Sequence, residues 1–142
     1  MKRGSAWLIL LIVALALLGC GQQRTAAVKL DFGTSSIYTT ADMTAAVEVI
    51  LEEFNTWDGC ELYRISYSSD EACNASNIAW MNELGEAKAV GETFTQCIMF
   101  KSHFHSPQTA SGGWNPDEDY TDWQWWLARS DKGQWQLLTW GY

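Results

Sequence analysis

The sequence predicts a single α+β domain in which helices come early and strands come late. Three observations carry this prediction: an amphipathic segment after residue 39, an alternating segment over 91–104, and a tryptophan-rich hairpin over 120–142. Helices followed by a run of strands are typical of the α+β class. We therefore expect an N-terminal helix and a second short helix on one face of a curved antiparallel sheet of about four strands.

The first helix is indicated by apolar residues at helical spacing. The residues that share one face are Met43, Val47, Ile50, Leu51 and Phe54, which lie at i, i+4, i+7, i+8 and i+11. Thr39 or Thr40 is expected to cap its start, and Asp58-Gly59 to follow its end. Such a stripe is wide enough to cover a sheet.

The next segments alternate between strand and helix signals. Residues 60–67 alternate as a strand, residues 70–84 form a loosely periodic second helix, and residues 91–104 are rich in aromatic and β-branched side chains typical of a strand. Residues 105–119 carry Pro, Gly and acidic residues, which indicate a long loop. Long loops are enriched in functional residues.

The chain ends in a predicted β-hairpin that contains five of the nine tryptophans. Ser130-Asp131-Lys132-Gly133 is the expected turn. Alternation places Trp123, Trp125 and Leu127 on one face and Gln124, Trp126 and Ala128 on the other. A ribbon this apolar needs a cover, which the first helix is expected to supply. The whole pattern resembles the cystatin-like and NTF2-like folds, in which a sheet curves around a helix.

The first twenty residues predict export. Lys2 and Arg3 precede an apolar run over 6–18 that is short for a membrane-spanning helix. The ending Leu17-Leu18-Gly19-Cys20 resembles the bacterial lipobox, which implies a signal peptide over 1–19 and cleavage before Cys20. The resemblance also implies a diacylglyceryl group on the Cys20 thiol and an acyl chain such as palmitate on the new amino terminus. A transmembrane anchor or a different cleavage site are the alternatives.

This organisation gives a lipidated tether over 20–30, a single domain over 31–142, and a location on the extracytoplasmic face of the cell membrane. Loss of Lys2 and Arg3 with the signal peptide changes the formal charge from −8 to −10. Such a negative charge argues against nucleic acid as a partner, because phosphates would be repelled. The membrane contact is therefore assigned to the acyl chains.

Three cysteines remain in the domain, so at most one pair can form a disulfide. Cys60 and Cys97 both fall in predicted strands and are the pair that we expect, whereas Cys73 lies outside them. Each of the three is equally compatible with a small buried apolar side chain.

Aromatic residues near the hairpin are candidates for ligand binding. These are Trp114, Tyr120, Trp123, Trp125 and Trp126. Indole and phenol rings stack on sugars, aromatic rings or cations, and acidic neighbours favour a cationic ligand. The alternative is that most of these rings are packed in the core.

A metal site is the second candidate. His103 and His105 lie two apart at a strand end, and Asp117 and Asp119 close the following loop, a residue set that could bind zinc with an open position. Asn115, Asp117, Asp119 and Thr121 also match the first odd positions of a calcium loop, but Tyr120 and Trp126 stand where glycine and glutamate are required. A solvated acidic loop is the alternative to both.

No catalytic motif is present. The sequence lacks a Gly-x-Ser-x-Gly turn, a phosphate-binding glycine loop and a paired-cysteine redox motif. A small hydrolase or isomerase using His103 with Asp122 in the sheet concavity rests on fold analogy alone. We therefore expect a non-enzymatic module without cofactors that binds a small molecule, a peptide or a neighbouring membrane protein.

The chain also resembles a group of uncharacterised exported lipoprotein domains from Gram-positive, mostly clostridial, bacteria, some of them attached to membrane-bound sensor peptidases. The matching segments are residues 32–36, 45–47, 54–62, 66–71, 113–116, 120–125 and 140–142. The resemblance implies an extracytoplasmic α+β domain of binding or sensing type and assigns no catalytic residue.

Overall fold

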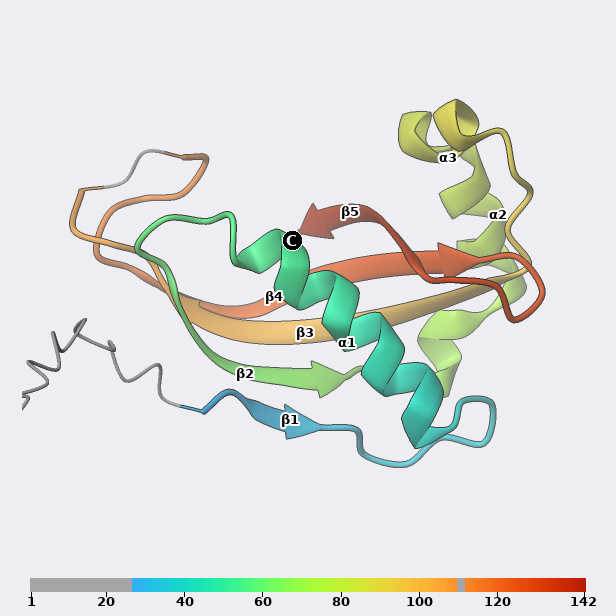
Figure 1. Cartoon of the computed structure of the whole chain (residues 1–142), viewed down its shortest axis with the longest axis horizontal. Helices are drawn as coiled ribbons and strands as arrows, with labels where there is room; N and C mark the ends of the chain where they lie inside the picture. The colour runs from blue at the N-terminus through green and yellow to red at the C-terminus, as the bar shows by residue number, and fades with distance from the viewer. Residues whose placement is uncertain (1–26, 110–111) are drawn as a thin grey trace, which may run out of the picture.

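Five strands form one sheet in the order β1-β2-β3-β4-β5 (Figure 1). The strands are β1 (Lys29–Asp31), β2 (Glu61–Tyr67), β3 (Gln96–His105), β4 (Asp119–Arg129) and β5 (Gln136–Gly141). All neighbours pair antiparallel except β1, which runs parallel to β2. The computed structural model describes residues 27–109 and 112–142, so the predicted signal peptide and Cys20 lie outside the described residues.

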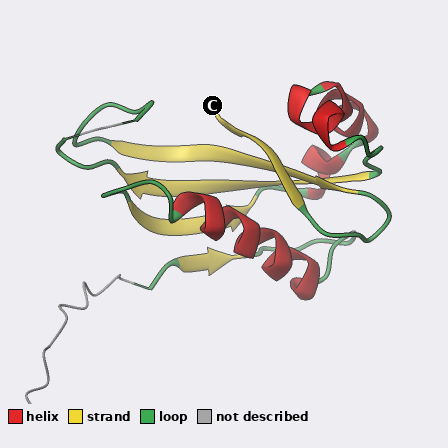
Figure 2. Ribbon diagram, turned by 45° about the horizontal axis from the view of Figure 1, so that its top comes forward, coloured by secondary structure: helices red, strands yellow, loops and turns green. Residues whose placement is uncertain are grey.

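Helices lie on both faces of this sheet. α1 (Thr40–Phe54) crosses one face, while η1 (Asp70–Cys73), α2 (Ala75–Glu83) and α3 (Gly85–Val90) gather at one end on the other face (Figures 1 and 2). Within residues 27–109 and 112–142, no helix has the length and apolar character needed to cross a membrane. The predicted α+β class is confirmed. The sheet has five strands rather than four, is mixed rather than antiparallel, and carries helices on both faces rather than on one.

α1 forms where the sequence predicts it. Thr39 is the N-cap, and its hydroxyl accepts a hydrogen bond from the backbone N–H of Asp42 while the Asp42 carboxylate accepts one from the backbone N–H of Thr39. The helix buries Met43, Ala46, Val47, Ile50 and Phe54 against the sheet. Leu51 was expected on this face but is only half-buried.

The core between α1 and the sheet is large and aromatic. Its strand residues include Ile65, Ile98, Phe100, Trp125 and Leu127, each fully buried. A smaller core beneath α2 and α3 contains Met81, Phe94, Cys97, Ala128 and Leu138. Successive residues such as Leu127 and Ala128 therefore enter opposite cores, as the predicted alternation requires.

Two bulges flank His103 on β3. On β2 the register shifts between Leu62 and Arg64, and on β4 it shifts opposite Ser102 and Phe104. The β4 bulge contains Asp122, whose φ of 58° lies in the left-handed region. Each bulge adds a residue to the face opposite α1 and bends its strand. Bulges are common beside functional surfaces.

Three elements differ from the sequence prediction. β1 lies in the segment expected to be a tether and an irregular stretch, so the folded domain starts by Lys29. The predicted strand over 91–104 begins only at Gln96, because residues 85–90 form α3 and Gly91 ends that helix at φ 74°. The predicted helix over 70–84 is divided into η1 and α2 at Asn74, which caps α2.

Candidate functional site

A cluster of aromatic rings fills the end of the sheet beneath the C-terminus of α1. We call it the aromatic cluster; its members are Trp57, Phe104, Trp114, Tyr120, Trp123, Trp125, Trp140 and Tyr142. Trp57 is its centre, with ring centroids 4.8 Å from Trp114 and 5.0 Å from Trp125. Offset and edge-to-face contacts at these distances stabilise aromatic pairs.

The cluster has a buried part and an exposed part. Trp125 is fully buried, and its Nε1 donates to Ser102 Oγ at 2.8 Å. By contrast, Trp140 is 42% exposed and Tyr142 is 76% exposed. The pairing of Trp125 with Trp140 places both on the α1 face of the sheet, so the exposed rings continue the buried cluster to the edge strand β5.

Two indoles in this cluster lack hydrogen-bond partners. The Nε1 atoms of Trp114 and Trp123 are buried and have no acceptor among the described residues. A buried donor without an acceptor costs roughly 1–3 kcal/mol. The indoles of Trp114 and Trp123 are therefore held in place by ring packing and not by hydrogen bonds.

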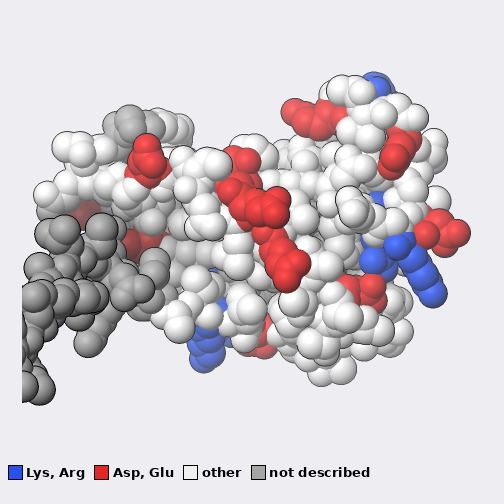
Figure 3. Space-filling model, in the orientation of Figure 1, with Lys and Arg blue, Asp and Glu red and all other residues white. Residues whose placement is uncertain are grey.

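Carboxylates surround the exposed rings. The pKa of Tyr142 is raised by its partial burial, then by the charges of Tyr120, Glu118 and Asp122. On the opposite side of the cluster, Trp57 Nε1 donates to Glu53 Oε1 at 3.1 Å. Acidic side chains also form a band over α1 on the face shown in Figure 3. The electrostatic environment of the exposed rings is therefore negative.

The predicted histidine and aspartate residues converge on the opposite face of the sheet. Asp119 Oδ1 lies 3.3 Å from His103 Nε2 and 3.1 Å from His105 Nδ1, and Asp117 Oδ1 lies 3.1 Å from His105 Nε2. The Tyr63 ring packs edge-on against His103 at 5.1 Å. We call His103, His105, Asp117 and Asp119 the His–Asp cluster.

The His–Asp cluster stabilises a charged imidazole. Both nitrogens of His105 face a carboxylate, so both can donate only when the ring is protonated. Hydrogen bonds that His105 donates to Asp119 and then to Asp117 raise the pKa of His105. The hydrogen bonds that Asp119 accepts from His105 and then from His103 lower the pKa of Asp119. The nitrogens point at the carboxylates, and no group of three or more His, Cys, Asp or Glu side chains in residues 27–109 and 112–142 is arranged to hold a metal ion.

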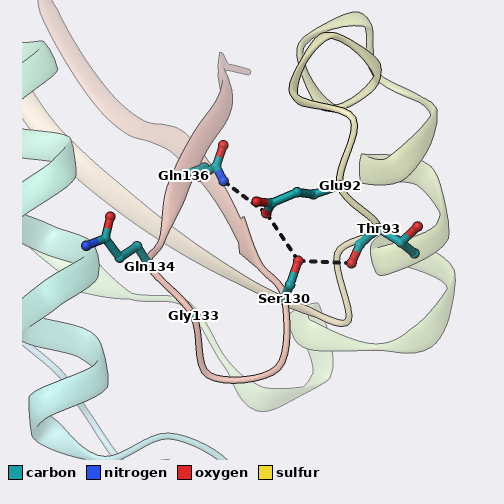
Figure 4. A pocket seen from close by; sticks show the side chains of 6 residues that line it. All are labelled: Glu92, Thr93, Ser130, Gly133, Gln134 and Gln136. Atoms are coloured by element: carbon teal, nitrogen blue, oxygen red, sulfur yellow. Dashed lines mark hydrogen bonds between the residues drawn. The ribbon is translucent and has the colours of Figure 1, made fainter.

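A surface pocket lies away from both clusters. It has a volume of about 470 Å³ and is lined by Glu92, Thr93, Ser130, Gly133, Gln134 and Gln136 (Figure 4). Its polar groups bond to one another: Ser130 Oγ lies 3.3 Å from Glu92 Oε2 and 3.0 Å from the Thr93 carbonyl oxygen. It contains a single exposed carboxylate and no predicted site residue, so it is a polar surface recess without a candidate function.

The structure separates the predicted ligand-binding aromatics. Trp114, Trp123, Trp125 and Tyr120 do meet, but Trp125 is fully buried and Tyr120 is 9% exposed, so both belong to the core. Trp126 lies on the other face and packs edge-on against Trp80 at 5.2 Å.

The most exposed rings of the cluster, Trp140 and Tyr142, were not among the predicted residues. Trp140 pairs directly with Trp125, but a register shift opposite Trp126 and Leu127 produces this pair, so alternation counted from the turn would not have found it.

Two further predicted pairs do not form. His103 contacts Asp119, whereas Asp122 lies 3.7 Å from Lys101, and both are on the face away from α1. Cys60 precedes the end of β2 that pairs with His105, and Cys97 lies at the other end of β3. At roughly 3.3 Å per residue the two cysteines are about 26 Å apart, so the predicted Cys60–Cys97 disulfide is wrong.

Comparison with protein-family models, with curated proteins and with solved structures finds no significant match in any of the three. The surfaces described above are therefore the basis for a functional assignment.

Proposed function

We propose that this chain is a non-enzymatic binding module, anchored by lipid at Cys20 on the extracytoplasmic face of the membrane, and that its ligand is an extended cationic peptide segment. The observation that carries the proposal is the exposure of Trp140 on the edge strand β5 and of Tyr142 just after it, with the charges of Glu118 and Asp122 acting on Tyr142.

The edge of β5 supports an extended peptide as the ligand. β5 pairs with β4 on one side, and no strand of the described chain pairs with its other side. An edge strand offers unpaired backbone N–H and C=O groups to which an extended peptide can add as a further strand. Trp140 and Tyr142 then supply contacts for the side chains of the peptide.

The surrounding charge supports a cationic peptide. Guanidinium and ammonium groups bind to the faces of indole and phenol rings, and nearby carboxylates strengthen the attraction. Glu118 and Asp122 act on Tyr142, and Glu53 contacts Trp57 in the same cluster. The formal charge of −10 that remains after loss of Lys2 and Arg3 adds long-range attraction for a basic segment.

The test measures binding of a probe peptide to the full chain in detergent micelles. The probe is an unstructured eight-residue lysine peptide, and the same peptide with every lysine acetylated is the comparison without side-chain charge. We expect salt-sensitive binding that W140A weakens about tenfold, as loss of a contact of about 1.4 kcal/mol would. The matched control is W80A, because Trp80 is equally exposed, at 42%, but lies on the other face. Equal losses in W80A and W140A, or no binding of the basic peptide, would overturn the proposed ligand.

Lipid anchoring is tested separately from ligand binding. The chain purified from membranes should carry the mass of a diacylglyceryl group on Cys20, and Cys20→Ser should leave the protein in the aqueous phase of a detergent partition. An unmodified Cys20 in membrane-bound protein would contradict the anchor without affecting the peptide-binding proposal.

A further inference from the structure

Cys73 and Cys97, which come from different elements, meet beneath η1. Cys97 Sγ lies 3.8 Å from the carbonyl oxygen of Ala72, the residue before Cys73. Cys73 Sγ lies 3.5 Å from the Ser69 carbonyl oxygen and 3.5 Å from the Tyr67 hydroxyl. Both cysteines contact the smaller core under α2, where Cys97 is fully buried and Cys73 is partly buried.

We infer that Cys73 and Cys97 form a reversible disulfide, which links η1 to the start of β3, when the protein reacts with an external disulfide. Cys60 takes no part, because it lies at the far end of the β2–β3 pair. The inference is independent of the peptide-binding proposal, since neither cysteine belongs to the aromatic cluster.

The two thiols differ in the way that such an exchange requires. Cys73 is the accessible member, and a hydrogen bond from the Cys97 thiol, followed by one from Tyr67, lowers the pKa of Cys73. The same contact with Cys73, together with burial, raises the pKa of Cys97. Cys73 is therefore the thiolate that reacts first, and Cys97 is the thiol that completes the bond.

The exchange balances in two steps. The Cys73 thiolate attacks one sulfur of an external disulfide, forming a mixed disulfide and releasing one thiolate that takes up a proton. Cys97 then loses its proton and attacks Cys73 Sγ, releasing the second external thiol. Two protein thiols are oxidised by two electrons, and one external disulfide is reduced to two thiols.

The sequence makes the bond easy to identify by mass. Trypsin cleaves after Lys29, Arg64, Lys88 and Lys101, which places Cys60 in residues 30–64, Cys73 in residues 65–88 and Cys97 in residues 89–101. Each cysteine of the domain therefore lies on its own peptide.

The experiment treats the full chain in detergent with glutathione disulfide, blocks free thiols and digests without reductant. We expect peptides 65–88 and 89–101 to be joined in the wild type and in C60S, and separate in C73S and C97S. The melting temperature of oxidised wild type should exceed that of the reduced protein by roughly 10 °C, because the bond closes a loop of 24 residues. Dithiothreitol should reverse both results. A link through residues 30–64, or blocked thiols on both Cys73 and Cys97 after this treatment, would overturn the inference.

Discussion

Arg129 and Asp42 form an ion pair that joins β4 to α1. Arg129 Nη1 lies 2.9 Å from Asp42 Oδ1, and the arginine side chain is only 7% exposed. The guanidinium also packs over the Trp135 ring, 4.2 Å from its centroid, and Nε donates to Gln96 Oε1. Asp42 therefore has two roles. It completes the capping box at the start of α1, and it is the counter-ion of Arg129, the only buried charged side chain among the described residues.

Substitution of Asp42 should therefore remove two interactions at once. We expect Asp42→Ala to lower the free energy of unfolding by about 2–4 kcal/mol, because the helix loses its capping box and Arg129 is left buried without a counter-ion. Urea denaturation followed by far-UV circular dichroism measures the change. Glu48→Ala, at an exposed position of the same helix, is the control and should stay within about 0.5 kcal/mol of wild type. Similar values for the two variants would contradict this role.

Acid should act on the same residue in a defined direction. Hydrogen bonds from Thr39, followed by the bond from Arg129, lower the pKa of Asp42. A lowered folded-state pKa gives stability that is complete above the unfolded value of about 3.9 and is lost as pH falls through the folded value. The difference in unfolding free energy between wild type and Asp42→Ala should therefore shrink below about pH 3.9. An unchanged difference at pH 2 would contradict the assignment.

Trp125 anchors the core, unlike the exposed indoles of the chain. We expect Trp125→Ala to cost about 3–5 kcal/mol, because a fully buried large ring leaves a cavity. Trp125→Phe should cost less but leave Ser102 Oγ without the indole donor. Trp80→Ala removes an equally large ring that is 42% exposed, so it should cost about 1 kcal/mol or less. Unfolding free energies from urea titration would rank the three variants, and a Trp80→Ala cost equal to that of Trp125→Ala would contradict the assignment.

The elements that could be predicted from sequence are those with local signals. α1 shows helical spacing and a capping threonine, and the hairpin shows alternation from Trp123 to Ala128 followed by a Ser130–Gly133 turn. β1 could not be predicted because it has only three residues and no periodicity. It exists through pairing with β2, whose partner residues lie 35 positions further along the chain, and Arg64 of β2 forms an ion pair with Asp31.

The candidate site was predictable in part for the same reason. Alternation correctly separated Trp123 and Trp125 from Trp126, but it could not show that α1 covers Trp125 completely. The contact between the predicted histidines and aspartates could be expected, because the histidines lie at the end of a strand and the aspartates at the end of the loop that follows it. These residues are His103, His105, Asp117 and Asp119. The position of Cys97 opposite Cys73 depends on the packing of η1 on β3, a long-range contact with no sequence signature.

Alanine substitutions at three glycines distinguish the stability cost of backbone strain from the stability cost of a steric clash. Gly59 has φ 76°, and an added Cβ would lie 2.9 Å from Pro107 Cβ; Gly33 has φ 53° with open space, and Gly85 has neither constraint. We expect Gly59→Ala to cost about 2–3 kcal/mol, Gly33→Ala about 1–2 kcal/mol, and Gly85→Ala within about 0.5 kcal/mol of zero. Thermal unfolding of the three variants gives the order. Equal costs at Gly59 and Gly33 would show that Pro107 moves aside.

The His–Asp cluster predicts a pH dependence with a definite sign. Hydrogen bonds that His105 donates to Asp119 and then to Asp117 raise the pKa of His105, so its contribution to stability is complete below the unfolded value of about 6.5 and is lost as pH rises through the folded value. The lowered pKa of Asp119 gives a contribution that is lost as pH falls through its folded value. The cluster should therefore stabilise the fold most between about pH 4 and pH 6.5.

NMR titration of the His105 ring protons should give a pKa above 6.5 in wild type and a lower value in Asp119→Asn. Asp131→Asn, a change in the distant hairpin turn, should leave the titration unchanged. A His105 pKa that is the same in wild type and in Asp119→Asn would show that the carboxylate does not hold the proton on the ring.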